Sequence, residues 1–471
     1  MKDLTKYFIN GEWVMPSTQN SLVVKNPANE KPIATISLGT GKDIDLAVLA
    51  ARNAFETFSN TSKDERLKLL NLLLEVYMDR YEEMAQAISQ EMGAPISFSR
   101  RSQTDCGRGH IKATIDALTN YEFDTKLKTG HVYREPVGVC GFITPWNWPI
   151  NQIACKVAPA LATGCTMILK PSEIAPLSSH LFAEMMDQAG YKNGVFNLVD
   201  GLGPEVGAAI SSHPDIDMVS FTGSTLAGIA VSKSAAETVK RVCLELGGKS
   251  PNIILDHDNY KVAIEKGVDH CFRNTGQSCN APTRMIVPES RYEEAIEIAK
   301  EYAPSMKVGD PTDETVRIGP IVSGMHFDRV QNYIKTGIEE GARVVFGGLG
   351  KPKGLETGNY TKPTLFVDVE DDMAVVKEEI FGPVLCIQTY KDIDNAVDMA
   401  NDTKYGLAAY VSGEEEIAHN LAHRLKAGMV SVNSIGQGYD CPFGGYKQSG
   451  NGRECGEFGF EDFLEVKTIA G

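Results

Sequence analysis

The chain has 471 residues, 42% of them hydrophobic, which is enough to form two or three domains with a sizeable core. Its formal net charge of -16 argues against nucleic acid or an anionic membrane as the main partner, because both bind a basic face. No apolar run approaches the roughly 18 residues of a membrane span, and the N-terminus lacks the apolar core of a signal peptide. Ten cysteines without a regular framework indicate reduced thiols, so we expect a soluble cytoplasmic protein.

The first part of the chain is predicted to be helical. Between Asp43 and about Met92, apolar residues recur at helical spacing, and Asp64 stands at an N-terminal end, where the helix dipole favours acids. Residues 121–133 instead alternate polar and apolar side chains, which is typical of an exposed β-hairpin.

From about residue 137, short apolar runs alternate with helical stretches. Runs typical of buried parallel strands are residues 139–144, 166–169, 195–199 and 218–221. The predicted helices between them cover residues 177–189 and 225–234. A second alternating region follows, with strands expected at residues 252–255, 285–287, 343–346 and 364–367. This β–α alternation predicts an α/β fold with doubly wound sheets.

Three residues far apart in the sequence point to one chemistry. Cys279 ends a Gly-containing turn, Glu245 lies 34 residues earlier, and Asn147 lies between two tryptophans. Taken singly, each has a plainer interpretation: a small buried thiol, a surface carboxylate or helix cap, and a turn residue before a proline. Glu245 stands between Leu244 and Leu246 after an expected helical run, and it would point away from solvent if those leucines pack.

Together, the three residues supply what covalent oxidation of an aldehyde requires. An aldehyde has no good hydride to give until a thiolate adds to its carbonyl carbon and forms a tetrahedral adduct. The adduct expels hydride and leaves a thioester, which water must then hydrolyse. Such a scheme needs an activated cysteine, donors for the developing oxyanion and a base for the water.

The order of motifs resembles that of the NAD(P)-dependent aldehyde dehydrogenase superfamily, in its hydrolytic, non-CoA-acylating branch. The likeness runs from residues 8–13 (Phe-Ile-Asn-Gly-Glu-Trp) to the tail at residues 461–467. Six motifs lie between them in the family's order: residues 145–149, 170–173, 221–225, 245–249, 272–279 and 379–384.

The resemblance implies an aldehyde dehydrogenase-like α/β fold with two doubly wound Rossmann-like domains and a small β oligomerisation arm. The cofactor-binding domain would comprise residues 1–117 and 137–245, and the catalytic domain residues 246–447. Residues 118–136 and 448–471 would form the arm and the C-terminal tail, and a homodimer or a homotetramer is expected.

The resemblance also implies the catalytic roles. Cys279 would be the nucleophile, and the side-chain amide of Asn147 would hold the oxyanion beside the backbone N–H of Cys279. Glu245 would activate the water, and Lys156 matches a family lysine near the site. No metal site is indicated.

Cofactor residues come partly from position and partly from the resemblance. Residues 221–225 follow an apolar strand and open a helix, so their backbone N–H groups can face a phosphate. Lys170 and Glu173 end a strand, where ligands bind in open α/β sheets, although a solvated Lys–Glu pair is the plainer interpretation. A carboxylate at Glu173 would repel a 2′-phosphate, which favours NAD over NADP. The expected cofactor-binding residues are Thr144, Trp146, Lys170, Glu173, Gly203, Phe221, Gly223, Ser224, Glu379 and Phe381, with Gly203 as readily a plain turn.

The substrate is less well defined. Arg273 resembles the arginine that succinate-semialdehyde dehydrogenases use for the substrate carboxylate, and a guanidinium can pair bidentately with an acid. Those enzymes have a second arginine where this chain has Cys155, and they carry a serine-bearing loop that residues 436–441 lack. A broad aldehyde oxidiser is therefore favoured, and a succinate-semialdehyde-type enzyme is the alternative.

Three other classes fit less well. A CoA-acylating relative would lack a glutamate at the position of Glu245. A cysteine hydrolase would need a histidine base, and no nearby motif offers one. A structural descendant without activity would have no need to retain Cys279, Glu245 and Asn147 together.

Overall fold

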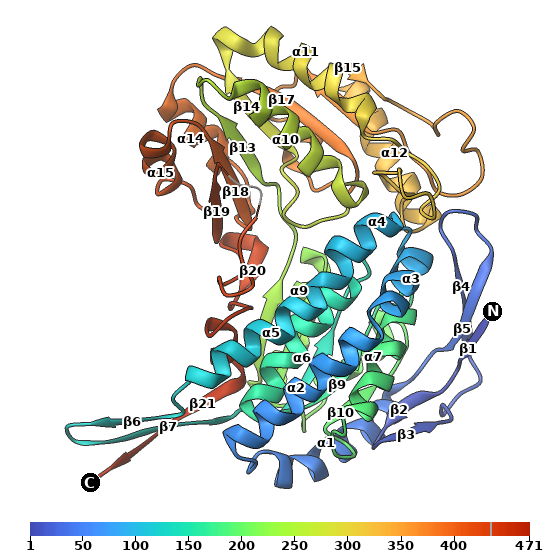
Figure 1. The fold of residues 1–471 in the computed structure, drawn as a ribbon, viewed down its shortest axis with the longest axis vertical. Coiled ribbons are helices and arrows are strands. Elements are labelled where there is room, and N and C mark those ends of the chain that lie inside the picture. Colours follow the sequence, from blue (N-terminus) through green and yellow to red (C-terminus); the bar gives the residue numbers. More distant parts are fainter. Residues whose placement is uncertain (434–435) are drawn as a thin grey trace.

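The computed structural model describes residues 1–433 and 436–471. The chain forms two lobes, each built around one large β-sheet, and a narrow three-stranded arm that projects from one of them (Figure 1). Within the described ranges, none of the helices combines the length and apolar character that crossing a bilayer requires.

The first lobe, the eight-stranded lobe, holds a sheet with strand order β20-β12-β11-β8-β9-β10-β2-β3. Its five central strands run parallel, and β2 and β20 join antiparallel at the two sides. The chain proceeds outward from β8 through β9 to β10 and then returns to the other side of β8, so the order reverses between β8 and β11. Ligands bind at the carboxyl edge of such a reversal. The strands are β2 (Tyr7–Ile9), β3 (Glu12–Val14), β8 (Val139–Ile143), β9 (Thr166–Lys170), β10 (Phe196–Leu198), β11 (Met218–Thr222), β12 (Arg241–Glu245) and β20 (Gly450–Asn451).

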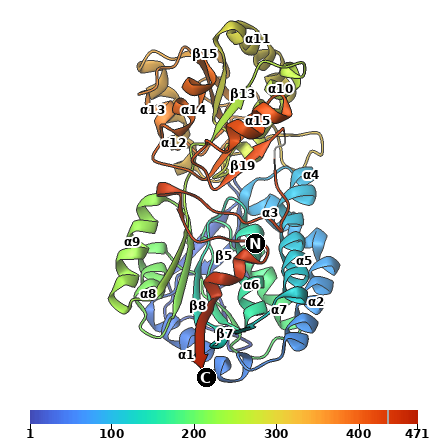
Figure 2. The same cartoon turned by 90° about the vertical axis from the view of Figure 1, so that its left-hand side faces the viewer.

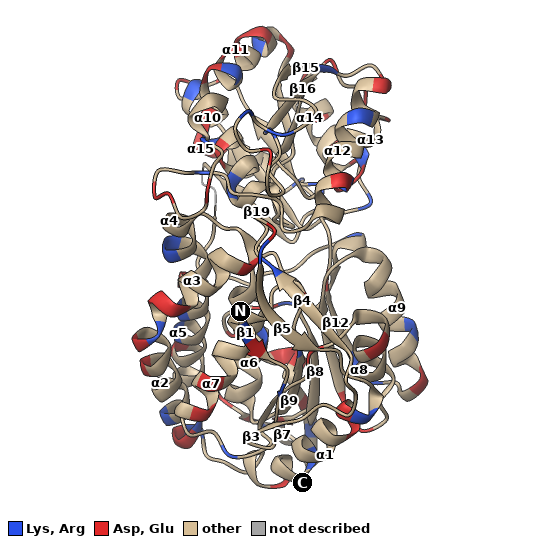
Figure 3. Cartoon of the chain, turned by 90° about the vertical axis from the view of Figure 1, so that its right-hand side faces the viewer, with Lys and Arg blue, Asp and Glu red and all other residues tan. Residues whose placement is uncertain are grey.

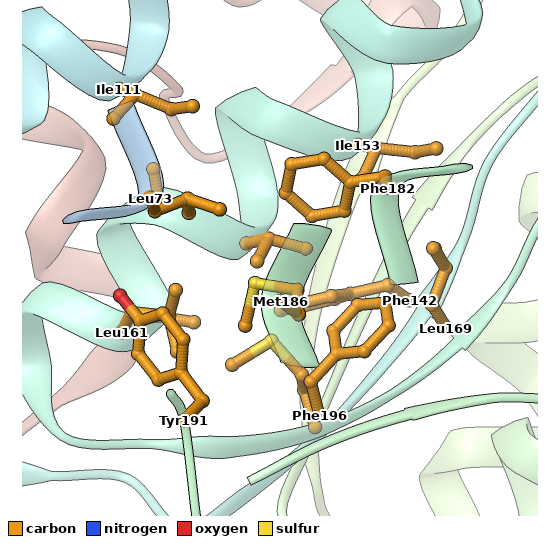
Figure 4. Packing of buried hydrophobic residues seen from close by; sticks show 14 of the residues in the cluster. Leu73, Ile111, Phe142, Ile153, Leu161, Leu169, Phe182, Met186, Tyr191 and Phe196 are labelled. Carbon is orange, nitrogen blue, oxygen red and sulfur yellow. The ribbon is translucent and has the colours of Figure 1, made fainter. Parts of the chain in front are cut away.

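Helices cover both faces of this sheet (Figure 2). Alternate residues of β8 point to opposite faces: Phe142 packs into one apolar cluster and Val139 into the other. Figure 4 shows Phe142 packed with Phe182 and Phe196 in the first cluster. Helices α2 (Lys63–Asp79), α3 (Tyr81–Met92), α5 (Thr104–Asn120), α6 (Pro149–Thr163) and α7 (Leu177–Gln188) contribute to that face, and α1 (Gly41–Phe58), α8 (Ala208–Ser212) and α9 (Thr225–Ala235) to the other.

The second lobe, the seven-stranded lobe, has strand order β15-β16-β17-β14-β13-β18-β19, with only β15 antiparallel. Its strands are β13 (Pro251–Ile254), β14 (Arg284–Pro288), β15 (Arg343–Phe346), β16 (Thr364–Val367), β17 (Val384–Tyr390), β18 (Ala408–Ser412) and β19 (Met429–Val432). Helices α10 (Tyr260–Phe272) and α11 (Tyr292–Tyr302) pack on one face, and α14 (Ile393–Asn401) and α15 (Glu415–Ala422) on the other. Helices α12 (Gly324–Glu339) and α13 (Ala374–Lys377) pack against β16 and β17.

The projecting arm joins a hairpin to the end of the chain. β6 (Asp124–Leu127) and β7 (Gly130–Pro136) form the hairpin, and β21 (Leu464–Ala470) pairs antiparallel with β7 along its whole length. A second small sheet near the N-terminus consists of β1 (Lys2–Leu4), β4 (Ser21–Lys25) and β5 (Pro32–Ser37). Acidic and basic segments are interspersed along the outer helices of both lobes (Figure 3).

The predicted α/β fold is confirmed, and the predicted strands of both lobes agree with the structure to within one or two residues. The predicted hairpin at residues 121–133 is also present, as β6 and β7. The expectation that Glu245 follows a helical run is wrong, because residues 241–245 form β12, held between β11 and β20. The packing of Leu244 and Leu246 does bury Glu245, as expected.

Candidate active site

A cavity of about 250 Å³ lies where the carboxyl ends of β11 and β12 face the seven-stranded lobe. Residues of both lobes line it, and eight of the predicted site residues are among them. The lining residues are Pro145, Trp146, Asn147, Thr222, Gly223, Ser224, Glu245, Leu246, Gly247, Cys279, His326, Arg329, Glu379 and Phe381.

A strained turn presents Cys279 to this cavity. Asn274 and Thr275, just after α10, have φ values of 55° and 58°, in the left-handed region that a β-branched residue rarely adopts. Gly276 continues the turn at φ 69°, and a side chain there would overlap the backbone of Gly382. Buried amides hold the turn in place: the Asn274 Nδ2 group donates to the Asn147 carbonyl at 3.0 Å and to the Gln277 carbonyl at 3.1 Å.

Asn147 and Trp148 dock the segment that enters α6 against the Cys279 turn. The Asn147 Nδ2 group donates to the Gln277 carbonyl at 3.1 Å, and the Trp148 indole donates to Ser278 Oγ at 2.8 Å. A primary amide carries two N–H donors, so one hydrogen of Asn147 remains for a ligand in the cavity that the residue lines.

Glu245, at the end of β12, is 4% exposed, and neither of its carboxylate oxygens has a hydrogen-bond partner among the described residues. Burial raises the pKa of Glu245 well above its ordinary value, the nearby carboxylate of Glu454 raises it further, and Lys156 acts in the opposite direction. A buried carboxyl without partners that titrates at raised pH has the properties of a general base that operates near neutrality.

The surroundings of Cys279 favour its neutral thiol over the thiolate. Burial raises its pKa above the ordinary cysteine value, and the carboxylates of Glu379 and Glu245 raise it further. The backbone N–H groups of Cys279 and Asn280 act in the opposite direction and lower the pKa of the thiol. The thiol must lose its proton before it can attack.

Lys156 lies outside the cavity, inside the eight-stranded lobe. Its ammonium group pairs with Glu454 and donates to Ser220 Oγ at 2.9 Å. Burial by itself lowers the pKa of Lys156, but the facing Glu454 carboxylate outweighs it and the pKa is raised. Sequence reasoning missed Glu454, which is 298 residues from Lys156 and belongs to none of the motifs.

The remaining cofactor residues of the eight-stranded lobe lie at the carboxyl edge of the sheet. The backbone N–H of Thr144 donates to the Lys170 carbonyl at 3.1 Å, and Lys170 pairs with Glu173 at 3.2 Å. Ser224 caps α9, its Oγ accepting from the Ala227 backbone at 3.3 Å.

Two of the predicted cofactor glycines, Gly203 and Gly223, differ in how much room surrounds them. Gly223 closes the strand end so tightly that a side chain there would overlap the ring of Phe221. Gly203 opens the short π-helical segment η2 (Gly203–Gly207), and a side chain at this position would meet no atom within 4 Å. The two glycines therefore differ: only Gly223 is confined by its neighbours.

Glu379 and Phe381 close the opposite wall. The Glu379 carboxylate accepts from the Gly248 backbone at 3.0 Å, and burial raises its pKa to about 7. The Phe381 ring lies edge-on to Trp146, with 5.4 Å between centroids. Sequence reasoning missed His326 and Arg329, which bond the backbone of this wall: Arg329 donates to the Glu379 carbonyl at 2.7 Å and the His326 ring lies 2.7 Å from the Phe381 carbonyl oxygen.

Arg273 does not line the cavity around Cys279. Its guanidinium pairs with Asp269 at 2.6 Å, and Asp269 also pairs with Arg317. Arg273 lines an adjoining cavity of about 370 Å³, together with Trp148 and Cys155. Among the described residues, no cluster of three or more His, Cys, Asp or Glu side chains could hold a metal ion.

Comparisons with known proteins identify the family to which the chain belongs. The sequence model of the aldehyde dehydrogenase family matches residues 13–469. A 3-succinoylsemialdehyde-pyridine dehydrogenase from a Pseudomonas species is 52% identical over 473 residues, covering 100% of this chain and 99% of the relative. A crystal structure of mutant aldehyde dehydrogenase C from Pseudomonas syringae, complexed with NAD⁺ and octanal, is 50% identical with a TM-score of 0.98, covering 99% and 96% of the two chains. Betaine aldehyde dehydrogenase from Staphylococcus aureus, complexed with NAD⁺, is 34% identical with a TM-score of 0.96, covering 99% and 94%. The resemblance seen in the sequence is thus confirmed, and the chain belongs to the aldehyde dehydrogenase family.

Proposed function

We propose that this protein oxidises an aldehyde to the carboxylic acid with NAD, through a thioester on Cys279 that is hydrolysed by a water activated by Glu245. The observation that carries the proposal is the shared cavity. A thiol, an unpartnered buried carboxylate and an amide with a spare N–H meet there from three distant parts of the chain.

Each step of the proposed reaction has an assigned residue. Cys279 releases its thiol proton to solvent and its sulfur adds to the aldehyde carbon. The Asn147 amide and the Cys279 backbone N–H bind the oxyanion that forms. The adduct collapses to a thioester as hydride leaves the carbon. Glu245 then takes a proton from a water molecule as its oxygen attacks the thioester, and the carbon–sulfur bond breaks to release the acid. The Cys279 thiolate that leaves takes this proton back from Glu245, which restores both groups.

NAD, when bound, accepts the hydride. The carboxyl edge of the eight-stranded sheet fits such a dinucleotide, because Gly223 and Ser224 open α9, where backbone N–H groups suit a phosphate. Among the described residues, Lys170 alone bonds the Glu173 carboxylate, which retains acceptor capacity for ribose hydroxyls. Glu379 and Phe381 would hold the nicotinamide end. The carboxylate of Glu173 favours NAD, and equal or better kcat/KM with NADP would refute that preference.

For the substrate, we propose a broad range of aldehydes, with succinate semialdehyde as the alternative. The names of relatives point in several directions, namely octanal, 3-succinoylsemialdehyde-pyridine and betaine aldehyde. The ion pair between Arg273 and Asp269 supports a broad range of substrates, because a guanidinium that is already paired with a carboxylate binds a substrate carboxylate less strongly.

We also propose the domain division, the assembly and the location. Residues 1–117 and 137–245 would bind the cofactor, residues 246–447 would carry the nucleophile, and residues 118–136 and 448–471 would form the oligomerisation arm and tail. Apolar side chains on the arm support a homodimer or homotetramer, since Val466 is 67% and Ile469 55% exposed. A reducing cytoplasm would keep the Cys279 thiol free. Sedimentation of the protein truncated after Phe463 should show a smaller species than the full chain.

The test of the proposed reaction is product analysis with NAD, an aldehyde, and CoA either present or absent. We expect equimolar NADH and carboxylic acid in both reactions. A CoA ester formed only when CoA is present would assign the protein to the acylating branch, and absence of NADH with every aldehyde would refute the proposal.

A further inference from the structure

The adjoining cavity of about 370 Å³ is the approach to Cys279. Cys279 packs against an apolar cluster that includes Tyr410 and Met429, and both residues also line this cavity. Trp148 lines it as well and bonds the residue just before Cys279. A substrate whose aldehyde carbon meets Cys279 therefore extends its chain along these walls.

Most polar side chains of the walls are satisfied by one another. The hydroxyl of Tyr410 donates to the Asn280 carbonyl at 3.1 Å, and that of Tyr439 to Cys106 Sγ at 3.5 Å. Further contacts join His110 to Asn151 Oδ1 at 2.8 Å, His110 to Cys455 at 3.7 Å, and Cys155 to Glu454 at 3.3 Å. These groups support the wall and need no ligand.

Gln152 differs from these neighbours. It lines the same cavity and is 4% exposed, yet its side-chain amide has no hydrogen-bond partner among the residues that the structure describes. The Gln152 amide is not among the buried polar groups that lack a partner, so its atoms are accessible from the cavity that the residue lines. A free amide at a cavity wall can exchange water for a polar group of a ligand. The side-chain amide of Gln152 is therefore available to form a hydrogen bond with a polar group of the substrate.

Its position on α6 directs Gln152 toward the reacting end of the cavity. The Gln152 backbone donates to the Trp148 carbonyl at 3.0 Å, so the two residues lie one helical turn apart on the same side. The adjacent amide of Asn151 uses Oδ1 for His110, which leaves its Nδ2 hydrogens as further donors at this wall.

The charged residues near Gln152 favour an uncharged substrate group beside it. Cys155, three residues further along α6, contacts the Glu454 carboxylate, whose charge is already paired with the Lys156 ammonium. This ion pair leaves Lys156 no free charge with which to hold an anionic substrate group. Arg101 and Arg273 lie elsewhere, where this cavity meets the next one. A substrate carboxylate would be attracted to these two arginines, whereas a substrate group beside Gln152 would gain only a hydrogen bond.

We propose that Gln152 determines specificity by donating a hydrogen bond to a neutral acceptor on the substrate, such as a keto carbonyl, an amide carbonyl or an aromatic ring nitrogen. The preferred substrates are aldehydes that bear such an acceptor along the chain, rather than plain alkanals. The inference rests on the proposed aldehyde oxidation, because it concerns the same site.

The test compares levulinaldehyde, which has a keto group, with pentanal, which has the same chain length and none, in wild type and Gln152→Met. Methionine keeps the size of the side chain and removes the amide. We expect wild type to prefer levulinaldehyde and Gln152→Met to lose about tenfold in kcat/KM for it, the upper range for one neutral hydrogen bond. The kcat/KM for pentanal should stay unchanged or rise.

Two further variants keep the test decisive. Gln152→Glu retains the shape but offers no N–H donor when ionised, so it should also lose the preference for levulinaldehyde. Gln188→Met, on the exposed end of α7, is the matched control and should change neither substrate. Succinate semialdehyde forms a third arm, and its kcat/KM should respond less to Gln152→Met than that of levulinaldehyde.

The outcomes separate this inference from the proposed function. Equal losses for levulinaldehyde and pentanal, or no loss for either, would overturn the role of Gln152 while aldehyde oxidation stands. Wild-type protein that oxidises no aldehyde would overturn the proposed function, and the inference with it.

Discussion

Replacing Glu245 by glutamine separates the two halves of the proposed reaction. The substitution keeps the shape of the side chain and removes the only function assigned to it, acceptance of a proton from water. Thioester formation on Cys279 does not require Glu245 in this role, so one equivalent of NADH per subunit should form rapidly in Glu245→Gln. Hydrolysis should then limit turnover, and kcat should fall by about 10²–10⁴, the usual contribution of a general base.

The same substitution has a calculable effect on stability. Burial raises the pKa of Glu245 in the folded protein above its unfolded value of about 4.3, so above that pH the unfolded chain releases its proton first. The folded state then binds more protons, and stability falls by about 1.4 kcal/mol per pH unit until the folded pKa is reached. Glu245→Gln lacks this dependence and should gain stability relative to wild type as the pH rises above about 4, up to the raised pKa of the folded protein.

Stopped-flow absorbance measures the burst of NADH, and denaturant unfolding at several pH values measures stability. Glu56→Gln, at an exposed position on α1, is the matched control and should change neither quantity. Steady-state turnover of Glu245→Gln equal to wild type would refute the assigned role. A stability difference independent of pH would refute the reasoning from burial.

Three further substitutions test other parts of the site. Asn147→Ala removes one oxyanion donor and should lower kcat by about 10²–10³ in steady-state assays, with little change in KM; an unchanged kcat would contradict the donor role. Gly276→Ala places a side chain at φ 69° against the Gly382 backbone, and should cost about 1–3 kcal/mol in denaturant unfolding and reduce activity. Arg273→Ala should raise the KM for succinate semialdehyde about tenfold, near the lower value of a charge-assisted hydrogen bond, and leave that for propanal unchanged; equal effects would exclude Arg273 from substrate recognition.

The sequence predicted the elements whose apolar runs are long and continuous. Strands such as β8, β9 and β11 are fully buried, so their composition alone identifies them. Strand β12 begins with the partly exposed Arg241 and Val242 after a helical stretch, and its strand character depends on pairing with β11 on one side and β20 on the other. Short N-terminal strands of three residues, such as β2 and β3, likewise depend on partners distant in sequence.

The residues of the site likewise divide into those that a local sequence motif predicts and those that only the fold reveals. Cys279, Glu245 and Asn147 were predicted because each stands in a local motif, and their arrangement around one cavity came only from the fold. The Lys156–Glu454 pair could not be predicted, since it joins residues far apart whose neighbours in sequence give no indication of burial. The unpartnered state of Gln152 is equally a property of the folded wall, because it is defined by contacts that the amide does not make.

The central claim is that the substrate becomes covalently attached to Cys279, and intact-protein mass spectrometry during turnover tests it most directly. Glu245→Gln mixed with NAD and pentanal should gain the mass of one acyl group per subunit, located on Cys279 by peptide mapping, and Cys279→Ala should gain none and form no NADH. NADH formation that survives in Cys279→Ala, or an acyl group located on another residue, would contradict the account.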